Sequence, residues 1–69
     1  MNMEQVESSA VKAIGYDEGT RTARVEFKKG ATYDYDNVPP DSYARLKEAK
    51  SIGGELRNFT AIFKGRKVS

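Results

Sequence analysis

The sequence predicts a small α+β domain in which a three-stranded antiparallel meander sheet is packed on one face by an α-helix and a shorter C-terminal helix. Segments with alternating apolar and polar residues are separated by short Gly-containing turns, which is typical of hairpins. After a double proline, apolar residues instead recur at helical spacing.

The chain has 69 residues, enough for one domain. Because so short a chain buries only about 60% of its unfolded surface, a partner or a second copy in a homo-oligomer would add stability.

The first two strands are predicted at residues 9–16 and 21–28. Small and β-branched residues fill the first segment, and the Asp and Gly of residues 17–20 are typical of a hairpin loop. The second segment alternates, with Val25 and Phe27 on one side and charged residues between them. One face of this hairpin is therefore expected to be buried.

The turn at residues 28–30 determines which side of the third strand, at residues 31–37, is buried. A three-residue loop usually ends on a residue in the left-handed conformation, and Gly30 stands at that position. The resulting register joins two apolar rows and one pair of opposite charges: Ala23 with Tyr35, Val25 with Tyr33, and Arg24 with Asp34. A two-residue loop would turn both tyrosines to the charged face, because a slip of one residue inverts every side chain.

A helix is predicted at residues 40–50. Pro40 suits the first helical position, where a backbone N–H has no intrahelical partner, and Asp41 lies near the positive end of the helix dipole. One narrow face is apolar and is expected to lie on the sheet, namely Tyr43, Leu46 and Ala49.

Gly53-Gly54 is expected to act as a hinge or helix stop after that helix. A second helix is predicted at residues 54–63, where apolar residues again recur at helical spacing. A strand through residues 60–63 is the alternative, because Thr, Ile and Phe also favour strands. Residues 1–7 and 65–69 are expected to be loose ends.

The composition excludes several functional classes. The chain contains no Cys and no His, which removes thiol and imidazole chemistry, disulfides and ordinary zinc sites. We expect neither a metal nor a cofactor. The N-terminal residues lack the cationic start and apolar run of a signal peptide, and no apolar stretch approaches the ~20 residues of a membrane span. A cytoplasmic protein without membrane contact is the expectation.

The net charge of +2 conceals an asymmetry along the chain. Residues 1–40 carry five Lys and Arg against seven Asp and Glu, a net −2, whereas residues 41–69 carry seven against three, a net +4. From Arg57 onward there is no acidic residue. Such a segment can contact phosphate, because a basic face gains affinity by releasing counterions. A solvated helix face with a frayed end is the plainer interpretation.

Catalysis is the least favoured class. Glu26, Asp34 and Asp36 resemble candidate acid/base or Mg²⁺ carboxylates, but all three fall on the polar face of the hairpin, where nothing indicates desolvation. Ser8 and Ser9 have no His and no evident Lys to act as a base. We therefore expect a protein that is not an enzyme.

The spacing of the aromatic residues assigns most of them to the core. Period 2 in the strands and helical spacing beyond them turn six rings inward, namely Phe27, Tyr33, Tyr35, Tyr43, Phe59 and Phe63. Tyr16 stands at the tip of the first predicted hairpin. It is expected to be the most exposed ring and the one available to stack on a base.

A set of short motifs runs through residues 6 to about 53, namely Ser8-Ser9, Ile14-Gly15-Tyr16-Asp17, Val25, Phe27, Gly30, Tyr33-Asp34-Tyr35, Val38-Pro39, Tyr43 and Leu46. With these motifs the segment closely resembles the KTSC domain, a short module named for its place at the C-terminus of some lysyl-tRNA synthetases and also found as a free-standing bacterial or phage protein. Beyond them this chain keeps the basic character of the family's tail but lacks its late tyrosines. The resemblance implies a nucleic-acid role only by analogy with the tRNA-charging enzyme, since the family has no settled function.

Two functions from different classes are consistent with these features. The first is a non-catalytic nucleic-acid binding module, for RNA or DNA and preferably RNA, with modest and salt-dependent affinity. Its expected contacts come from seven residues: Tyr16, Lys28, Lys29, Arg57, Lys64, Arg66 and Lys67. The second is a small phage or mobile-element protein that binds and modulates a bacterial protein complex, or a homodimer joined through the uncovered face of its sheet.

Overall fold

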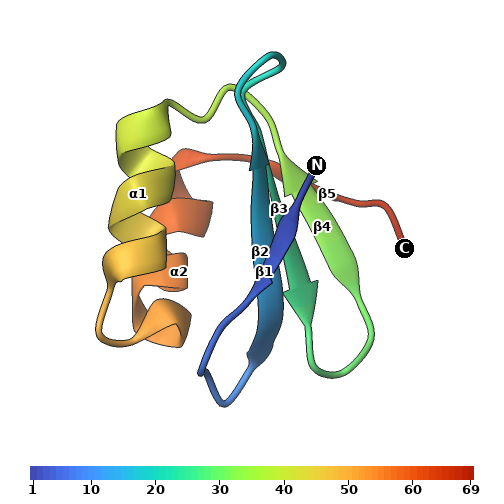
Figure 1. Ribbon diagram of the computed structural model, residues 1–69, viewed down its shortest axis with the longest axis vertical. Helices are drawn as coiled ribbons and strands as arrows, with labels where there is room; N and C mark the ends of the chain where they lie inside the picture. The colour runs from blue at the N-terminus through green and yellow to red at the C-terminus, as the bar shows by residue number, and fades with distance from the viewer.

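Five antiparallel strands and two helices make up the computed structural model, which describes residues 1–69 (Figure 1). The sheet order is β1-β2-β3-β4-β5, so the strands follow chain order and both helices are inserted between β4 and β5. The elements are β1 (Met3–Gln5), β2 (Val11–Asp17), β3 (Thr22–Phe27), β4 (Thr32–Tyr35), α1 (Pro40–Glu48), α2 (Ile52–Ile62) and β5 (Gly65–Lys67).

The β3–β4 hairpin forms in the predicted register. Ala23 lies opposite Tyr35, and Val25 lies opposite Tyr33. Gly30 has φ +106°, in the region that residues with a Cβ rarely adopt, and its N–H donates to the carbonyl of Phe27 at 3.0 Å. The three-residue loop is therefore confirmed, and with it the placement of both tyrosines on the apolar face.

The expectation of three strands is wrong, because a further strand pairs with each edge of the meander. β1 pairs with β2, with Met3 opposite Gly15, and β5 pairs with β4, with Gly65 opposite Tyr35. Residues expected to be loose ends thus form edge strands. Each is only three residues long, so neither contains enough alternation to be recognised in the sequence.

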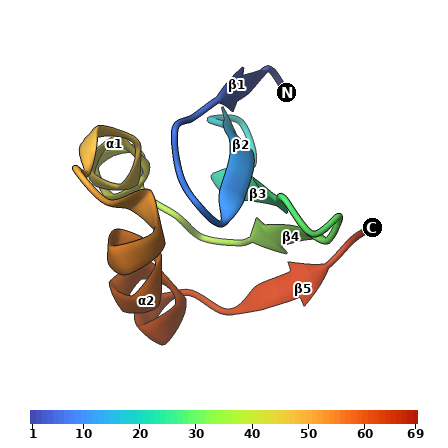
Figure 2. The ribbon, with the colours of Figure 1, turned by 90° about the horizontal axis from the view of Figure 1, so that it is seen from below.

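Both helices lie on the same face of the sheet, as Figure 2 shows in a view along the strands. α1 begins at Pro40, as predicted. α2 begins two residues earlier than predicted, because the Ser51 hydroxyl caps it by accepting a hydrogen bond from the N–H of Gly54 at 3.2 Å. The two glycines therefore belong to the first turn of α2, and the alternative strand at residues 60–63 is not formed. Neither helix is long and apolar enough to cross a membrane.

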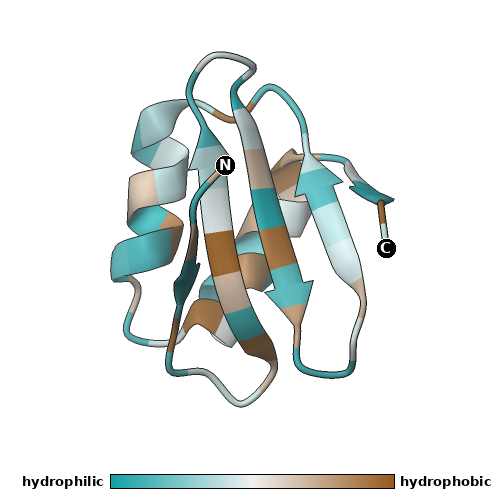
Figure 3. Cartoon of the chain, turned by 45° about the vertical axis from the view of Figure 1, so that its right-hand side comes forward, coloured by the Kyte–Doolittle hydropathy of each residue, from teal (hydrophilic) through white to brown (hydrophobic).

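The core lies between the helices and the apolar face of the sheet. Figure 3 shows the hydrophobic bands that alternate with hydrophilic ones along β3. The buried cluster draws on the inner strands, the β4–α1 connection and both helices. Its members are Val11, Ile14, Ala23, Val25, Tyr35, Val38, Leu46, Ile52, Leu56 and Phe59.

Tyr35 connects three parts of this core. Its ring meets Phe59 of α2 edge to face, with the centroids 5.2 Å apart. The same ring covers Gly65, where an added Cβ would overlap it. β5 can therefore pair with β4 only because residue 65 has no side chain.

Replacing Gly65 by Ala is expected to lower the free energy of unfolding by about 1–3 kcal/mol, because the new methyl group forces either Tyr35 or β5 to move. Gly53→Ala is the control, since its Cβ would lie at an ordinary 3.9 Å from the Ser8 hydroxyl, and it should leave stability unchanged or raise it by up to about 1 kcal/mol. Urea unfolding measures both. Equal stability of the two variants would contradict the packing described.

The face of the sheet without helices carries ion pairs. Arg24 and Asp34 form a two-pronged pair at 2.7 and 3.0 Å, and Asp34 is 4% exposed although it belongs to the polar face. Arg66 of β5 holds Asp36 in the same way, at 3.1 and 3.2 Å. Lys12 and Glu26 add a longer pair at 3.9 Å. The charges of this face thus largely neutralise one another.

Hydrogen bonds from Arg66 hold the pKa of the exposed Asp36 carboxyl below its ordinary value. Arg66→Gln is expected to raise this pKa toward the ordinary range, which an NMR titration of the carboxyl carbons measures. Because the folded pKa is the depressed one, the stabilisation is present above the unfolded pKa of about 4 and is lost as the pH falls through the folded value. An Asp36 titration unchanged by the substitution would show that the pair is not formed in solution.

Candidate functional site: a basic aromatic pocket

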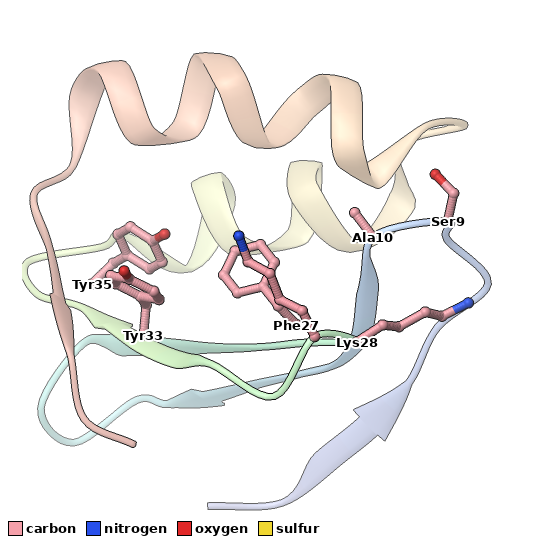
Figure 4. A pocket seen from close by; sticks show the side chains of 7 residues that line it. Ser9, Ala10, Phe27, Lys28, Tyr33 and Tyr35 are labelled. Atoms are coloured by element: carbon pink, nitrogen blue, oxygen red, sulfur yellow. The ribbon is translucent and has the colours of Figure 1, made fainter.

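A pocket of about 610 Å³ lies at the end of the sheet where the β3–β4 hairpin turns. Figure 4 shows its aromatic side chains rising from the sheet toward the helical layer. Its lining combines strand residues, the hairpin loop and the segment before β2: Ser9, Ala10, Phe27, Lys28, Lys29, Tyr33 and Tyr35. We refer to these seven residues as the basic aromatic pocket.

The hairpin register determines the aromatic part of the pocket. Phe27, Tyr33 and Tyr35 share the helix side of the sheet because they fall at alternate positions of β3 and β4. Phe27 and Tyr33 meet edge to face, with centroids 5.9 Å apart and planes at 87°. Tyr35 is buried, whereas Phe27 and Tyr33 are half-buried. Two rings therefore remain partly open to the pocket.

Two lysines line the pocket, and a third lies beside Tyr33 in the neighbouring strand. Lys28 and Lys29 occupy the exposed hairpin loop. Lys67 of β5 lies directly opposite Tyr33 in the ladder, which places it on the same face as that ring. None of the three forms an ion pair, in contrast to Lys12, Arg24, Lys47 and Arg66. We call Lys28, Lys29 and Lys67 the lysine rim.

Hydroxyl groups complete the lining. The Ser8 hydroxyl accepts hydrogen bonds from the N–H groups of Ala10 and Val11, both at 3.3 Å, and so shapes the loop that carries Ser9. Ser9 itself is exposed at the pocket. Burial, and to a smaller extent Tyr33, raises the pKa of the Tyr35 phenol, so that it is a neutral hydrogen-bonding group at neutral pH.

The expectation that Tyr16 is an exposed ring at a hairpin tip is wrong. Tyr16 lies within β2 opposite Ala23, which turns it toward α1. Its ring stacks on Tyr43 with centroids 4.8 Å apart, and its hydroxyl donates to the carbonyl of Val38. Tyr16 thus helps to attach α1 to the sheet, and its ring is already stacked within the protein.

The structure separates the basic residues of the C-terminal segment. Arg57 is exposed on α2 and lines no pocket, while Lys64 follows α2 and borders a different hollow with Asp36 and Arg66. Arg66 and Lys67 are neighbours in β5 and therefore point to opposite faces of the sheet. Of the basic residues that the sequence predicted as contacts, Lys28 and Lys29 line the basic aromatic pocket and Lys67 lies beside it.

The half-open positions of Phe27 and Tyr33 could not be inferred from their spacing. Alternation correctly assigns both rings to the apolar face. It does not show how far along the sheet the two helices cover that face. The sequence feature that could have indicated their exposure is their position near the hairpin turn at residues 28–30. Two short helices do not reach the end of a sheet, so side chains there are less covered. A pocket with partly open rings and unpaired cations can hold a flat, anionic ligand.

Comparison with known proteins places this geometry in a family. The sequence matches the KTSC domain over residues 7–58. That range contains all seven residues of the basic aromatic pocket, whereas Lys67 lies beyond it.

Three relatives extend the match. The chain is 41% identical over 59 residues to an uncharacterized protein of Stutzerimonas stutzeri, covering 86% of this chain and 79% of that protein. It is 45% identical over 51 residues to a protein of Tsukamurella paurometabola, covering 74% and 76%. It is also 35% identical over 60 residues to a lysine–tRNA ligase of Nostoc punctiforme, covering 87% of this chain and 10% of the ligase.

A solved structure has the same architecture. The crystal structure of a KTSC domain protein from Yersinia pestis superimposes with a TM-score of 0.90 at 30% identity, covering 99% of this chain and 97% of that one. The predicted resemblance is thus confirmed by sequence and by structure. With a five-stranded sheet, two helices on one face and a match over most of its length, the chain belongs to the KTSC domain family.

Proposed function

We propose that this chain is a non-catalytic nucleic-acid binding module, with RNA as its preferred partner, and that it binds through the basic aromatic pocket. The observation that carries the proposal is the position of two half-buried rings, Phe27 and Tyr33, among three lysines that have no ion-pair partner. A cytoplasmic location, where such a partner is available, is part of the proposal.

The two halves of the site have different roles. Lysine ammonium groups attract phosphates, and the release of counterions makes that attraction depend strongly on salt. Aromatic rings contribute by stacking on bases, which every base permits because every base has a flat face. We therefore expect modest affinity, little sequence preference and a steep fall in affinity as the salt concentration rises.

A relative supports the choice of RNA by analogy. The Nostoc punctiforme lysine–tRNA ligase contains a region 35% identical to this chain and acts, by its name, on a tRNA. The matched region is 10% of that enzyme. The analogy therefore concerns RNA contact by the shared module and does not extend to the activity of the ligase.

Removing the hairpin charges tests this function. Lys28→Gln with Lys29→Gln is expected to weaken the binding of a fluorescein-labelled single-stranded RNA about three- to tenfold at low salt. The slope of log Kd against log salt should fall by about 1.4, since each lysine lost removes about 0.7 of slope. Fluorescence anisotropy over a salt series measures both quantities.

The matched control removes two charges from the opposite face. Lys12→Gln with Arg66→Gln changes the net charge by the same amount, but both cations lie in ion pairs on the face without helices. This variant should bind within about twofold of the unchanged protein. If both double variants lose affinity equally, total charge rather than the pocket carries the binding.

A second candidate function is favoured by one apolar residue. Ile62, near the end of α2, is 72% exposed, and it borders a hollow of about 500 Å³ between α1 and α2 with Phe59 and Phe63. Exposed apolar groups mark contacts with other proteins where they form one contiguous patch, and Ile62 continues the apolar lining of this hollow. The uncovered sheet face, which the sequence suggested for a homodimer, instead carries charges that are paired within the chain.

Ile62→Lys tests the second candidate, because it places a charge at this hollow while affecting little of the core. Sedimentation equilibrium and pulldown from a bacterial lysate are the measurements. If the protein functions through this surface, the substitution should remove a stable partner that the unchanged protein retains at high salt. If no partner is retained by either form, the second candidate is not supported.

A further inference from the structure

We infer that the ligand of the basic aromatic pocket is a single-stranded segment of nucleic acid, and that one unpaired base enters the pocket beside Tyr33 while the phosphates on either side contact the lysine rim. This inference rests on the proposed function and makes it more specific. It distinguishes an unpaired base from the surface of a double helix.

The size of the pocket is the first argument. Its volume of about 610 Å³ falls within the range of roughly 300–1,000 Å³ that small-molecule sites occupy. One nucleotide is a ligand of this size. A double helix, whose major groove alone is about 12 Å wide, can touch the mouth of such a pocket but cannot enter it.

The exposure of the rings is the second argument. Tyr33 and Phe27 are half-buried and meet edge to face, so each has only part of its surface free. A base in a duplex is stacked on both sides and paired at its edge, and must be extruded before it can contact a recessed ring. An unpaired base has a free face and reaches the ring without that cost.

The positions of the lysines are the third argument. Lys67 is the direct cross-strand partner of Tyr33. Lys28 and Lys29 are three and four residues beyond Val25, which lies opposite Tyr33 on the other side, and so are roughly 10–13 Å away at about 3.3 Å per residue. Tyr33 thus has cations both beside it and toward the turn. A strand that inserts a base at Tyr33 can place phosphates at both positions.

The opposite face provides the contrast. Lys12, Arg24 and Arg66 are the cations of the broad sheet surface, and all three lie in ion pairs with carboxylates. A flat surface of unpaired cations, which a duplex backbone needs, is therefore not formed there. Lys28, Lys29 and Lys67 form no ion pair and lie beside a pocket with recessed rings.

Three probes of one length test the inference on the unchanged protein. They are a labelled ten-nucleotide single strand, the same strand annealed into a blunt duplex, and a ten-residue abasic strand that keeps the phosphates and lacks the bases. The single strand is expected to bind at least about fivefold more tightly than the abasic strand, which is the lower end of the effect of stacking one base. It should also bind more tightly than the duplex at equal salt.

The outcomes separate the inference from the proposed function. If the three probes bind alike and respond only to salt, the chain binds nucleic acid through phosphates and the inference is overturned. If the duplex binds best, the inference is overturned in the same way. If none of the probes binds at low salt, the proposed function fails and the inference fails with it.

A pair of variants locates the contact. Tyr33→Leu keeps an apolar side chain against Phe27 but removes the aromatic ring, and it should lower single-strand affinity at least about fivefold while leaving duplex affinity unchanged. Tyr33→Phe keeps the ring and should bind within about twofold of the unchanged protein. Equal losses for the single strand and the duplex in Tyr33→Leu would overturn the assignment to Tyr33. Circular dichroism of both variants establishes that they are folded.

Discussion

The register of the β3–β4 hairpin is the constraint on which the rest of the structure depends. Gly30, at φ +106°, closes a three-residue loop, and that loop sets Tyr33 and Tyr35 on the helix side of the sheet. From there Tyr35 packs on Phe59 of α2 and covers Gly65 of β5. A slip of one residue would turn both tyrosines to the opposite face. The contact of Tyr35 with α2, its contact with Gly65 of β5 and the aromatic lining of the pocket would then all be lost.

The same register divides the charges between two faces. On the face without helices, carboxylates of β4 and the residue after it meet the guanidinium groups of Arg24 and Arg66 in two-pronged pairs. Such pairs at partly exposed positions each contribute little to stability. They nevertheless occupy the cations of the broad surface, which are therefore not free to pair with an external anion. The lysine rim, Lys28, Lys29 and Lys67, has no such partners and lies beside the rings of Phe27 and Tyr33.

The segment that matches the KTSC family contains most of the candidate site but not all of it. The basic aromatic pocket lies entirely within the part of the chain that matches the KTSC domain, residues 7–58, and Lys67 lies beyond it. The rings and the hairpin lysines are therefore built by the matched region, whereas the third lysine depends on the pairing of β5 with β4. The pairing of β5 with β4 thus brings a C-terminal residue next to a pocket that the matched region forms.

Taken alone, the sequence determined the local features: the meander, its register, α1 with Pro40 at its start, α2, and the resemblance to the KTSC family. These follow from periodicity, turn chemistry and motif, which act over a few neighbouring residues. Only the tertiary structure decided which of the side chains predicted to bind a ligand are already engaged within the protein. Tyr16 stacks on Tyr43 because β2 passes under α1, and Arg66 is held by Asp36 because β5 reaches the edge of β4. The edge strands β1 and β5 are too short to have a period of their own, so they form only where a finished sheet offers unpaired backbone groups.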